Sequence, residues 1–242
     1  MRNRLSDASM SSEEGLIILL ATVKSDRQVQ QEVLRELRWD SRVDETEVGV
    51  EVDKGIVTLT GTVDSYAKKL AAREAAHRVV GVLDVADDIR VKSPGSRDRT
   101  DTEIARAVRT TLEWDAFVPD QKIRSTVTDG FVTLEGEVAT LREKEDAEAA
   151  VHNLAGVKGV RNRLFVAAVK ADPVKLRESI EEALERRAER EAERIRVRVE
   201  DGTVVLEGRV RTWPEKQTIL GAVSHAPGVR DVKDKLTVNP WD

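Results

Sequence analysis

Short segments in which apolar and polar residues alternate occur three times along this chain, each time in pairs. The positions that would share one strand face are Val48, Val50, Val52 with Val57, Leu59, Gly61, Val63; Ile123, Ser125, Val127 with Val132, Leu134, Gly136, Val138; and Ile195, Val197, Val199 with Val204, Leu206, Gly208, Val210. An Asp-Lys-Gly or Asp-Gly turn separates the two members of every pair. Alternation is typical of strands with one buried face, and Asp-Gly between two such runs predicts a β-hairpin. The pattern therefore predicts three hairpins.

Helical periodicity flanks each predicted hairpin, and a further strand ends each unit. Before the hairpins, apolar residues recur with helical spacing at Val29, Val33, Leu37; Ile104, Val108, Leu112; and Leu176, Ile180, Leu184. The predicted capping residues are Asp26, Asp101 and Asp172 for the first helices, and Ser65, Thr140 and Thr212 for the second helices. The residues that predict the last strands are Val85, Ile89, Val91; Val160, Leu164, Val166; and Val232, Leu236, Val238. Each unit is therefore predicted to run αββαβ.

The three units are copies of one module. The turn glycine recurs as Gly55, Gly130 and Gly202, at spacings of 75 and 72 residues, and other landmarks keep these spacings. The predicted fold class is α+β, with three tandem αββαβ domains, each a small three-stranded mixed sheet with two helices on one face. The predicted divisions are an N-terminal segment at 1–24, domain 1 at 25–92, a linker at 93–99, domain 2 at 100–167 and domain 3 at 172–239. The short junction after domain 2 predicts that domains 2 and 3 associate closely.

Glycine occupies two repeated positions that we interpret as structural. On the apolar face of the second strand lie Gly61, Gly136 and Gly208. A glycine there permits a bulge or the close approach of another backbone, and we interpret it as room for a helix that crosses the sheet. Near the predicted end of the second helix, where a glycine would terminate it, lie Gly81, Gly156 and Gly228.

Composition narrows the class of protein. Cysteine is absent, so neither disulfides nor thiolate chemistry contribute. The 40 basic and 45 acidic residues are mixed along the chain and give a net charge of −5, which argues against a nucleic-acid partner. No run reaches the roughly 18 apolar residues of a membrane helix. The short apolar run Leu16–Ala21 follows two glutamates and fits a signal peptide poorly, so a cytoplasmic location is predicted over a periplasmic one.

Few residues suggest chemistry. The motifs of serine hydrolases, zinc proteases and nucleotide-binding loops are missing, so no enzyme activity, cofactor or metal site is predicted. His77, His152 and His225 would form a metal or pH-sensing cluster only if three domains converged, and we favour half-exposed positions at helix edges. The mixed charges of residues 181–191 predict a solvated helix or one that pairs with another subunit.

Tryptophans are the candidate contact residues. Trp39 and Trp114 occupy equivalent positions at the end of the first helix, and Trp213 opens the second helix of domain 3. The first two rings would either cover the open end of the small sheet or anchor the protein at a membrane surface or in a partner groove. All three are candidate surface or partner contacts.

The ordered set of elements resembles the BON domain, also called the transport-associated domain. The residues that carry the resemblance are Gly130–Val138, Leu154–Val157 and Val160–Leu164, and the other copies repeat this frame with Asp87 and Asp234 in place of Asn162. The resemblance implies a non-catalytic protein that binds phospholipid surfaces or envelope partners during osmotic or envelope stress. The alternative is a soluble cytoplasmic stress protein that assembles into a homo-oligomer or senses a monovalent cation such as potassium.

Overall fold

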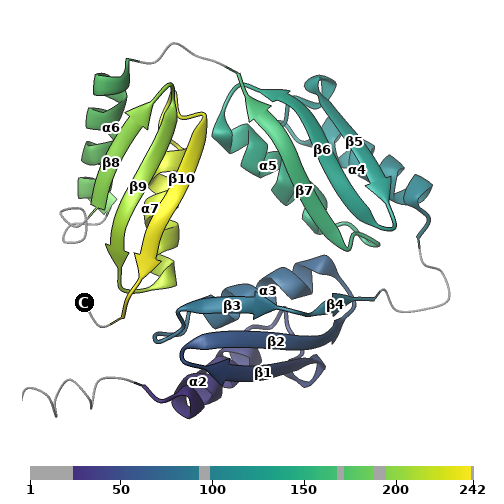
Figure 1. Ribbon diagram of the computed structural model, residues 1–242. Coiled ribbons are helices and arrows are strands. Elements are labelled where there is room, and N and C mark those ends of the chain that lie inside the picture. The colour runs from purple at the N-terminus through teal and green to yellow at the C-terminus, as the bar shows by residue number, and fades with distance from the viewer. Residues whose placement is uncertain (1–23, 93–98, 168–171, 188–194, 241–242) are drawn as a thin grey trace, which may run out of the picture.

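The computed structural model describes residues 24–92, 99–167, 172–187 and 195–240. Domain 1 contains α2 (Asp26–Trp39), β1 (Val48–Asp53), β2 (Ile56–Val63), α3 (Tyr66–His77), β3 (Asp84–Asp87) and β4 (Arg90–Val91). Domain 2 contains α4 (Asp101–Trp114), β5 (Ile123–Thr128), β6 (Phe131–Val138), α5 (Leu141–His152) and β7 (Gly159–Val166). Domain 3 contains α6 (Pro173–Arg187), β8 (Ile195–Glu200), β9 (Thr203–Val210), α7 (Trp213–Ser224) and β10 (Asp231–Val238). The predicted succession of three αββαβ domains is confirmed (Figure 1).

Three sequence predictions fall wholly or partly outside the described residues. These are the N-terminal segment with the apolar run Leu16–Ala21, the linker predicted at 93–99, of which residues 93–98 are not described, and the end of the charge run beyond Arg187. They remain predictions.

In each domain the central strand pairs with both of the others. β6 runs antiparallel to β5 and parallel to β7, and β2 and β9 have the same two kinds of partner. Asp129 (φ 53°) and Gly130 (φ 82°) close the β5–β6 hairpin in the left-handed region, as the tight turn favoured by Asp-Gly requires. In domain 1 the third strand is divided into β3 and β4, which both pair with β2. The predicted mixed sheet is therefore confirmed.

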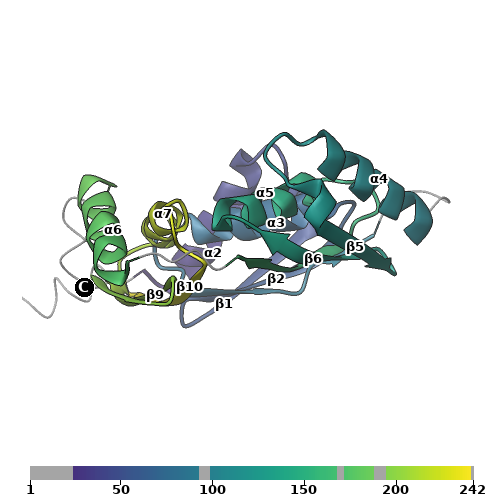
Figure 2. The ribbon, with the colours of Figure 1, turned by 90° about the horizontal axis from the view of Figure 1, so that it is seen from above.

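Both helices of each domain cover the same face of its sheet. Seen from above, the helices of all three domains lie on one side and the sheets on the other (Figure 2). In domain 2, Val132 and Leu134 of β6 belong to the same buried cluster as Ile104 and Leu112 of α4, and all four are at most 1% exposed. Full burial of one such side chain contributes about 1.5–3 kcal/mol. The helices therefore bury one apolar face and leave the opposite face of every sheet open.

The first helices of domains 1 and 2 begin one residue earlier than the sequence predicts. Ser25 and Thr100, not Asp26 and Asp101, are the N-caps, and each forms a capping box with the third helical residue. The carboxylate of Asp26 instead accepts hydrogen bonds from the backbone N–H groups of Lys54 (2.9 Å) and Gly55 (3.0 Å). Asp101 binds the turn of domain 2 in the same way. These carboxylates therefore tie the start of the first helix to the hairpin turn. In domain 3, Asp172 accepts from the N–H of Val174 at 3.0 Å, as a cap does.

The glycines of the central strands serve a different purpose from the one predicted. A Cβ atom at Gly136 would lie 2.1 Å from the carbonyl oxygen of Lys122, and one at Gly61 would lie 2.1 Å from that of Glu47. Both obstructing carbonyls belong to the residue just before the neighbouring strand, not to a helix crossing the sheet. Gly136 also has φ 138°, which side chains rarely adopt. The interpretation as room for a helix was wrong, and a local distortion of the hairpin is the reason for glycine.

A helix does approach closely at the second set of glycines. A Cβ atom at Gly81 would lie 3.1 Å from the Val29 side chain of α2, and one at Gly156 would lie 3.0 Å from Ile104 of α4. These glycines follow the second helix within a short turn rather than ending it directly, because α3 already ends at His77. They therefore let the first helix pack against the start of the last strand.

The buried side chains form two clusters. One belongs to domain 1, whereas the other runs without a break through domains 2 and 3. This continuity agrees with the predicted close association of domains 2 and 3. Trp213 of domain 3 is nevertheless packed against the domain 1 cluster, so the first domain is not separate from the third.

Candidate functional site

The ends of the two first helices expose tryptophan rings to solvent. Trp39 and Trp114 are the last residues of α2 and α4, and both are 85% exposed. The following residue, Asp40 or Asp115, turns the chain away through the C-cap and gives the ring no cover. The alternative in which the rings cover the open end of the sheet is therefore wrong. The fold gains almost no burial from either ring.

The two exposed helix ends differ at the third residue after the tryptophan. In domain 2, Phe117 is 76% exposed, and its backbone N–H donates to the Asp115 carboxylate at 2.9 Å. The equivalent residue in domain 1 is Arg42, which donates to Asp40 at 2.9 and 2.8 Å. We refer to Trp39 as the domain 1 corner, and to Trp114 with Phe117 as the domain 2 corner.

An ion-pair network holds the domain 1 corner in place. Hydrogen bonds from the Arg42 guanidinium hold the pKa of Asp40 well below its ordinary value, against the opposing effect of burial, and Arg78 adds to the shift. Arg78 donates to Asp40 at 2.9 Å and to Glu36 at 2.6 Å, which links the end of α3 to the end of α2. The helix end that presents Trp39 is therefore braced against the second helix of its own domain.

The third candidate tryptophan lies in a contact between domains. Trp213 is half-buried and stacks on His77 of domain 1, with ring centroids 4.0 Å apart and planes inclined by 18°. Its indole N–H donates to the backbone carbonyl of Leu83 at 3.3 Å. Trp213 therefore contacts another domain of the same chain, unlike Trp39 and Trp114.

The three histidines do not converge. His77 lies against Trp213, His225 accepts a hydrogen bond from Arg142 of domain 2 at 2.5 Å, and His152 lies half-buried at the end of α5. Across the described residues, no group of three or more His, Cys, Asp or Glu side chains is arranged to hold a metal ion. Two of the histidines instead occupy separate domain junctions.

A lysine of the second helix contacts the last strand in two of the domains. Lys69 donates to the carbonyl of Ile89 at 2.7 Å and lies 3.5 Å from Asp87. Lys216 donates to the carbonyl of Leu236 and to the Asp234 carboxylate, both at 2.8 Å. These aspartates also accept the backbone N–H two residues further on. The pairs therefore fasten the second helix to the edge of the sheet.

Domain 2 uses an amide where the other domains use the aspartate. Asn162 accepts from the N–H of Leu164 at 3.1 Å, and its amide donates to the backbone carbonyl of Lys144 at 2.7 Å and to Glu148 at 3.2 Å. The same helix-to-strand connection is thus made with a neutral side chain. The repeated lysine could have been found by aligning the three copies, because Lys69, Lys144 and Lys216 keep the spacings of the repeat.

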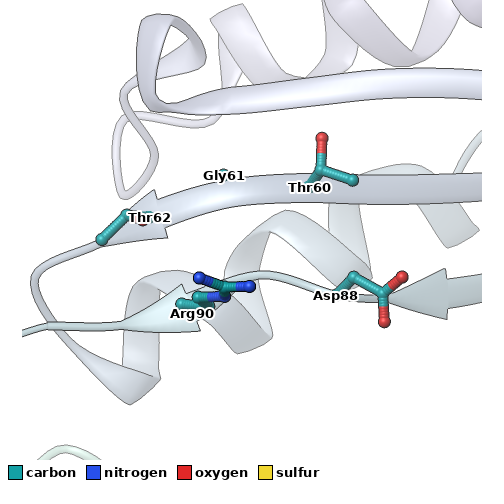
Figure 3. A pocket seen from close by; sticks show the side chains of 5 residues that line it. All are labelled: Thr60, Gly61, Thr62, Asp88 and Arg90. Atoms are coloured by element: carbon teal, nitrogen blue, oxygen red, sulfur yellow. The ribbon is translucent and has the colours of Figure 1, made fainter.

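The open sheet face of domain 1 carries a shallow recess. Thr60, Gly61 and Thr62 of β2 line one side, and Asp88 and Arg90 at the break between β3 and β4 line the other (Figure 3). All five residues are exposed.

In the other domains, ion pairs between strands occupy the equivalent place. Glu135 pairs with Arg163 at 3.4 Å in domain 2, and Glu207 pairs with Lys235 at 2.9 Å in domain 3. The recess of domain 1 therefore arises because Thr60 and Asp88 have shorter side chains than the residues of those pairs and cannot form an ion pair with each other. It has no buried polar group that would hold a ligand.

These features define a protein made of tandem copies of one small α+β module, with exposed aromatic side chains on two of them. The chain belongs to the BON domain family, because the family model matches residues 25–93, 100–168 and 172–240. Among the described residues, no helix combines the length and the apolar character needed to cross a bilayer.

One curated relative and two solved structures are similar to this chain. Osmotically-inducible protein Y of Escherichia coli (strain K12) is 32% identical over 123 residues, which span 49% of this chain and 61% of that protein. CdsD, a structural protein of the type III secretion system of Chlamydia trachomatis, is 13% identical, with 86% of this chain and 91% of that chain covered, at a TM-score of 0.25. The C-terminal domain of CdsD is 12% identical, with 90% and 100% covered, also at 0.25. Overlap this low carries no argument about the arrangement of the domains.

Proposed function

We propose that this chain is a non-catalytic osmotic-stress protein that attaches to phospholipid surfaces through the aromatic corners of domains 1 and 2. The observation that carries the proposal is the equivalent placement of Trp39 and Trp114, each 85% exposed. Tryptophan is enriched where an apolar ring with one polar N–H meets the boundary between lipid and water. The similarity to an osmotically-inducible protein supports the association with osmotic stress.

The corners suit weak attachment at two points. At roughly 25 cal/mol per Å², a ring that buries on the order of 100 Å² in the interface contributes about 2.5 kcal/mol. One ring alone would bind too weakly to hold the protein, but two rings on one chain raise the effective concentration of the second contact. Phe117 adds apolar area beside Trp114. Attachment therefore depends on both corners acting together.

The test is sedimentation of the full chain with vesicles of phosphatidylcholine, alone and mixed with phosphatidylglycerol. We expect Trp39→Ala to weaken vesicle binding at least tenfold, because about 2.5 kcal/mol of ring burial corresponds to more than a tenfold change. The double variant Trp114→Ala/Phe117→Ala should weaken it further. All three side chains are exposed, so the variants should keep the thermal stability of the parent.

Phe165→Ala is the matched control for these variants. Phe165 is an exposed aromatic residue, 57% accessible, but it lies on the open face of the domain 2 sheet rather than at a helix end. The proposal requires vesicle binding to survive this change. Equal losses in the corner variants and in Phe165→Ala, or no binding of the parent chain to either vesicle at low salt, would refute it.

The cellular compartment of the protein is tested separately, on the mature chain from native cells. We propose a cytoplasmic location, which the fate of the N-terminus in native cells tests directly. Cell fractionation followed by sequencing of the mature N-terminus should find an uncleaved chain in the cytoplasmic fraction. A cleaved chain in the periplasmic fraction would contradict this location while leaving the lipid-binding test unaffected.

A further inference from the structure

The three domains contact one another through the same part of the module. Tyr66 is the first residue of α3, Arg142 the second residue of α5, and Trp213 the first residue of α7. Each of these helices is the second helix of its domain, and each residue reaches the region of another domain where the second helix ends and the last strand begins. The domains occupy the corners of a triangle (Figure 1).

Domain 1 contacts domain 2 through Tyr66. The ring packs against the buried cluster of domains 2 and 3. Burial raises the pKa of the Tyr66 hydroxyl, while a hydrogen bond with the backbone of Val160 at the start of β7 acts in the opposite direction. Tyr66 is thus partly enclosed by the neighbouring domain.

Domain 2 contacts domain 3 through Arg142. Its guanidinium donates to Nε2 of His225, the residue that caps the end of α7, at 2.5 Å. The other ring nitrogen, Nδ1, faces the backbone carbonyl of Gly221 and must carry the proton, because a carbonyl only accepts. Asp146 pairs with the same guanidinium at 2.9 Å. A doubly protonated His225 has no lone pair for Arg142, so this contact requires the neutral imidazole.

Domain 3 contacts domain 1 through Trp213 and so closes the series. The ring stacks on His77, and its N–H donates to the carbonyl of Leu83. Both rings line an open groove, together with Arg73, Glu74, Arg78 and Gln217. Nε2 of His77 is buried without a hydrogen-bond partner. This contact too is built for a neutral imidazole.

We propose that the three domains close head to tail into a ring, and that protonation of His77, which lies in the junction between domains 3 and 1, opens it. A cyclic order follows from the contacts themselves: domain 1 reaches domain 2, domain 2 reaches domain 3, and domain 3 reaches domain 1. Acidification would release the contact between domains 3 and 1, while the buried cluster shared by domains 2 and 3 would keep those two domains together.

Burial opposes the protonation of His77 in the closed ring. His77 faces Arg73 and Glu74 of α3, Asp84 of β3 and Lys216 of α7, and burial followed by Arg73 lowers its pKa from 6.5 to about 4. A lowered pKa means that the closed state disfavours the proton. The histidine contribution to closure is therefore complete above about pH 6.5 and is lost as the pH falls towards 4.

Small-angle X-ray scattering of the full chain tests closure. At pH 7.5 we expect Trp213→Ala to increase the radius of gyration and the maximum dimension, because it removes the ring that docks on domain 1. Trp114→Ala is the matched control, since it removes a tryptophan that is 85% exposed at the end of its helix. An unchanged scattering profile in Trp213→Ala, or an equal expansion in both variants, would overturn the ring.

The acid response is tested by repeating the scattering at pH 4.5 with far-ultraviolet circular dichroism on the same samples. The parent chain should expand while its secondary structure is kept. The variant His77→Phe should stay closed at pH 4.5, because phenylalanine can still stack on Trp213 and takes up no proton. Expansion of this variant to the same extent as the parent, or a parent that stays closed, would overturn the proposed opening.

Discussion

Replacing Gly136 by alanine is expected to unfold domain 2 selectively. The new Cβ would lie 2.1 Å from the carbonyl oxygen of Lys122 and 3.1 Å from its carbonyl carbon, so the backbone of the neighbouring strand would have to move. The residue also has φ 138°, and such strain costs on the order of 1–3 kcal/mol in addition to the clash. A domain of this size has roughly 5 kcal/mol of stability or less. Most of that stability would be lost.

Hydrogen exchange of the full chain resolves the effect by domain. Amides of β5 and β6 should lose protection in Gly136→Ala, while those of domain 3 keep it. Gly221→Ala is the matched control, because nothing lies within 4 Å of a Cβ at Gly221 in the middle of α7. That change should be neutral or stabilising by up to about 1 kcal/mol, since alanine favours the helix over glycine. Native protection of β6 in Gly136→Ala would show that the hairpin tolerates a side chain there.

Replacing Asp234 by alanine is expected to destabilise domain 3 by about 2–4 kcal/mol. Removing one partner of a buried ion pair leaves the other charge uncompensated. Lys216 is 9% exposed, and Asp234 and the carbonyl of Leu236 are its two polar partners at 2.8 Å. This expected loss is smaller than the largest losses for fully buried ion pairs, because 31% of the Asp234 side chain is exposed to solvent. The substitution also removes the acceptor for the Leu236 N–H.

A double-mutant cycle with Lys216→Met separates the charge from the packing. Methionine keeps the length of the side chain, so the double variant Lys216→Met/Asp234→Ala should be more stable than Asp234→Ala alone. We expect a coupling energy of about 1–3 kcal/mol between the two changes. Unfolding in urea, followed through hydrogen exchange of the β9 and β10 amides, measures this energy. Additive effects of the two single changes would mean that the lysine and the aspartate act independently.

The repeated elements could be predicted from the sequence because their signals are local. Alternation in β6, the Asp129–Gly130 turn and the helical spacing of α4 each depend on neighbouring residues, so the αββαβ order followed. The reason for glycine at Gly136 could not be predicted. The strand pattern places the residue on the apolar face, but only the pairing with β5 brings the Lys122 carbonyl against it.

Contacts between distant segments explain the other differences. Asp26 resembles a helix cap in sequence, but Ser25 caps α2 and frees the Asp26 carboxylate for a turn 28 residues away. Trp39 lies at a helix end in the sequence, and only the direction taken by the chain at Asp40 determines that its ring is exposed. The stacking of Trp213 on His77 joins residues of different domains, which no periodicity records.

The most direct test of lipid attachment uses the tryptophans themselves. Three variants would each retain only Trp39, Trp114 or Trp213, with the remaining tryptophans, including Trp241, replaced by phenylalanine. Their fluorescence would be measured on vesicles that contain lipids brominated along the acyl chain, which quench rings within the membrane. The proposal predicts quenching of Trp39 and Trp114, which are 85% exposed, and none of Trp213, which is packed against His77. Unquenched Trp39 and Trp114, or equal quenching of Trp213, would contradict attachment through the aromatic corners.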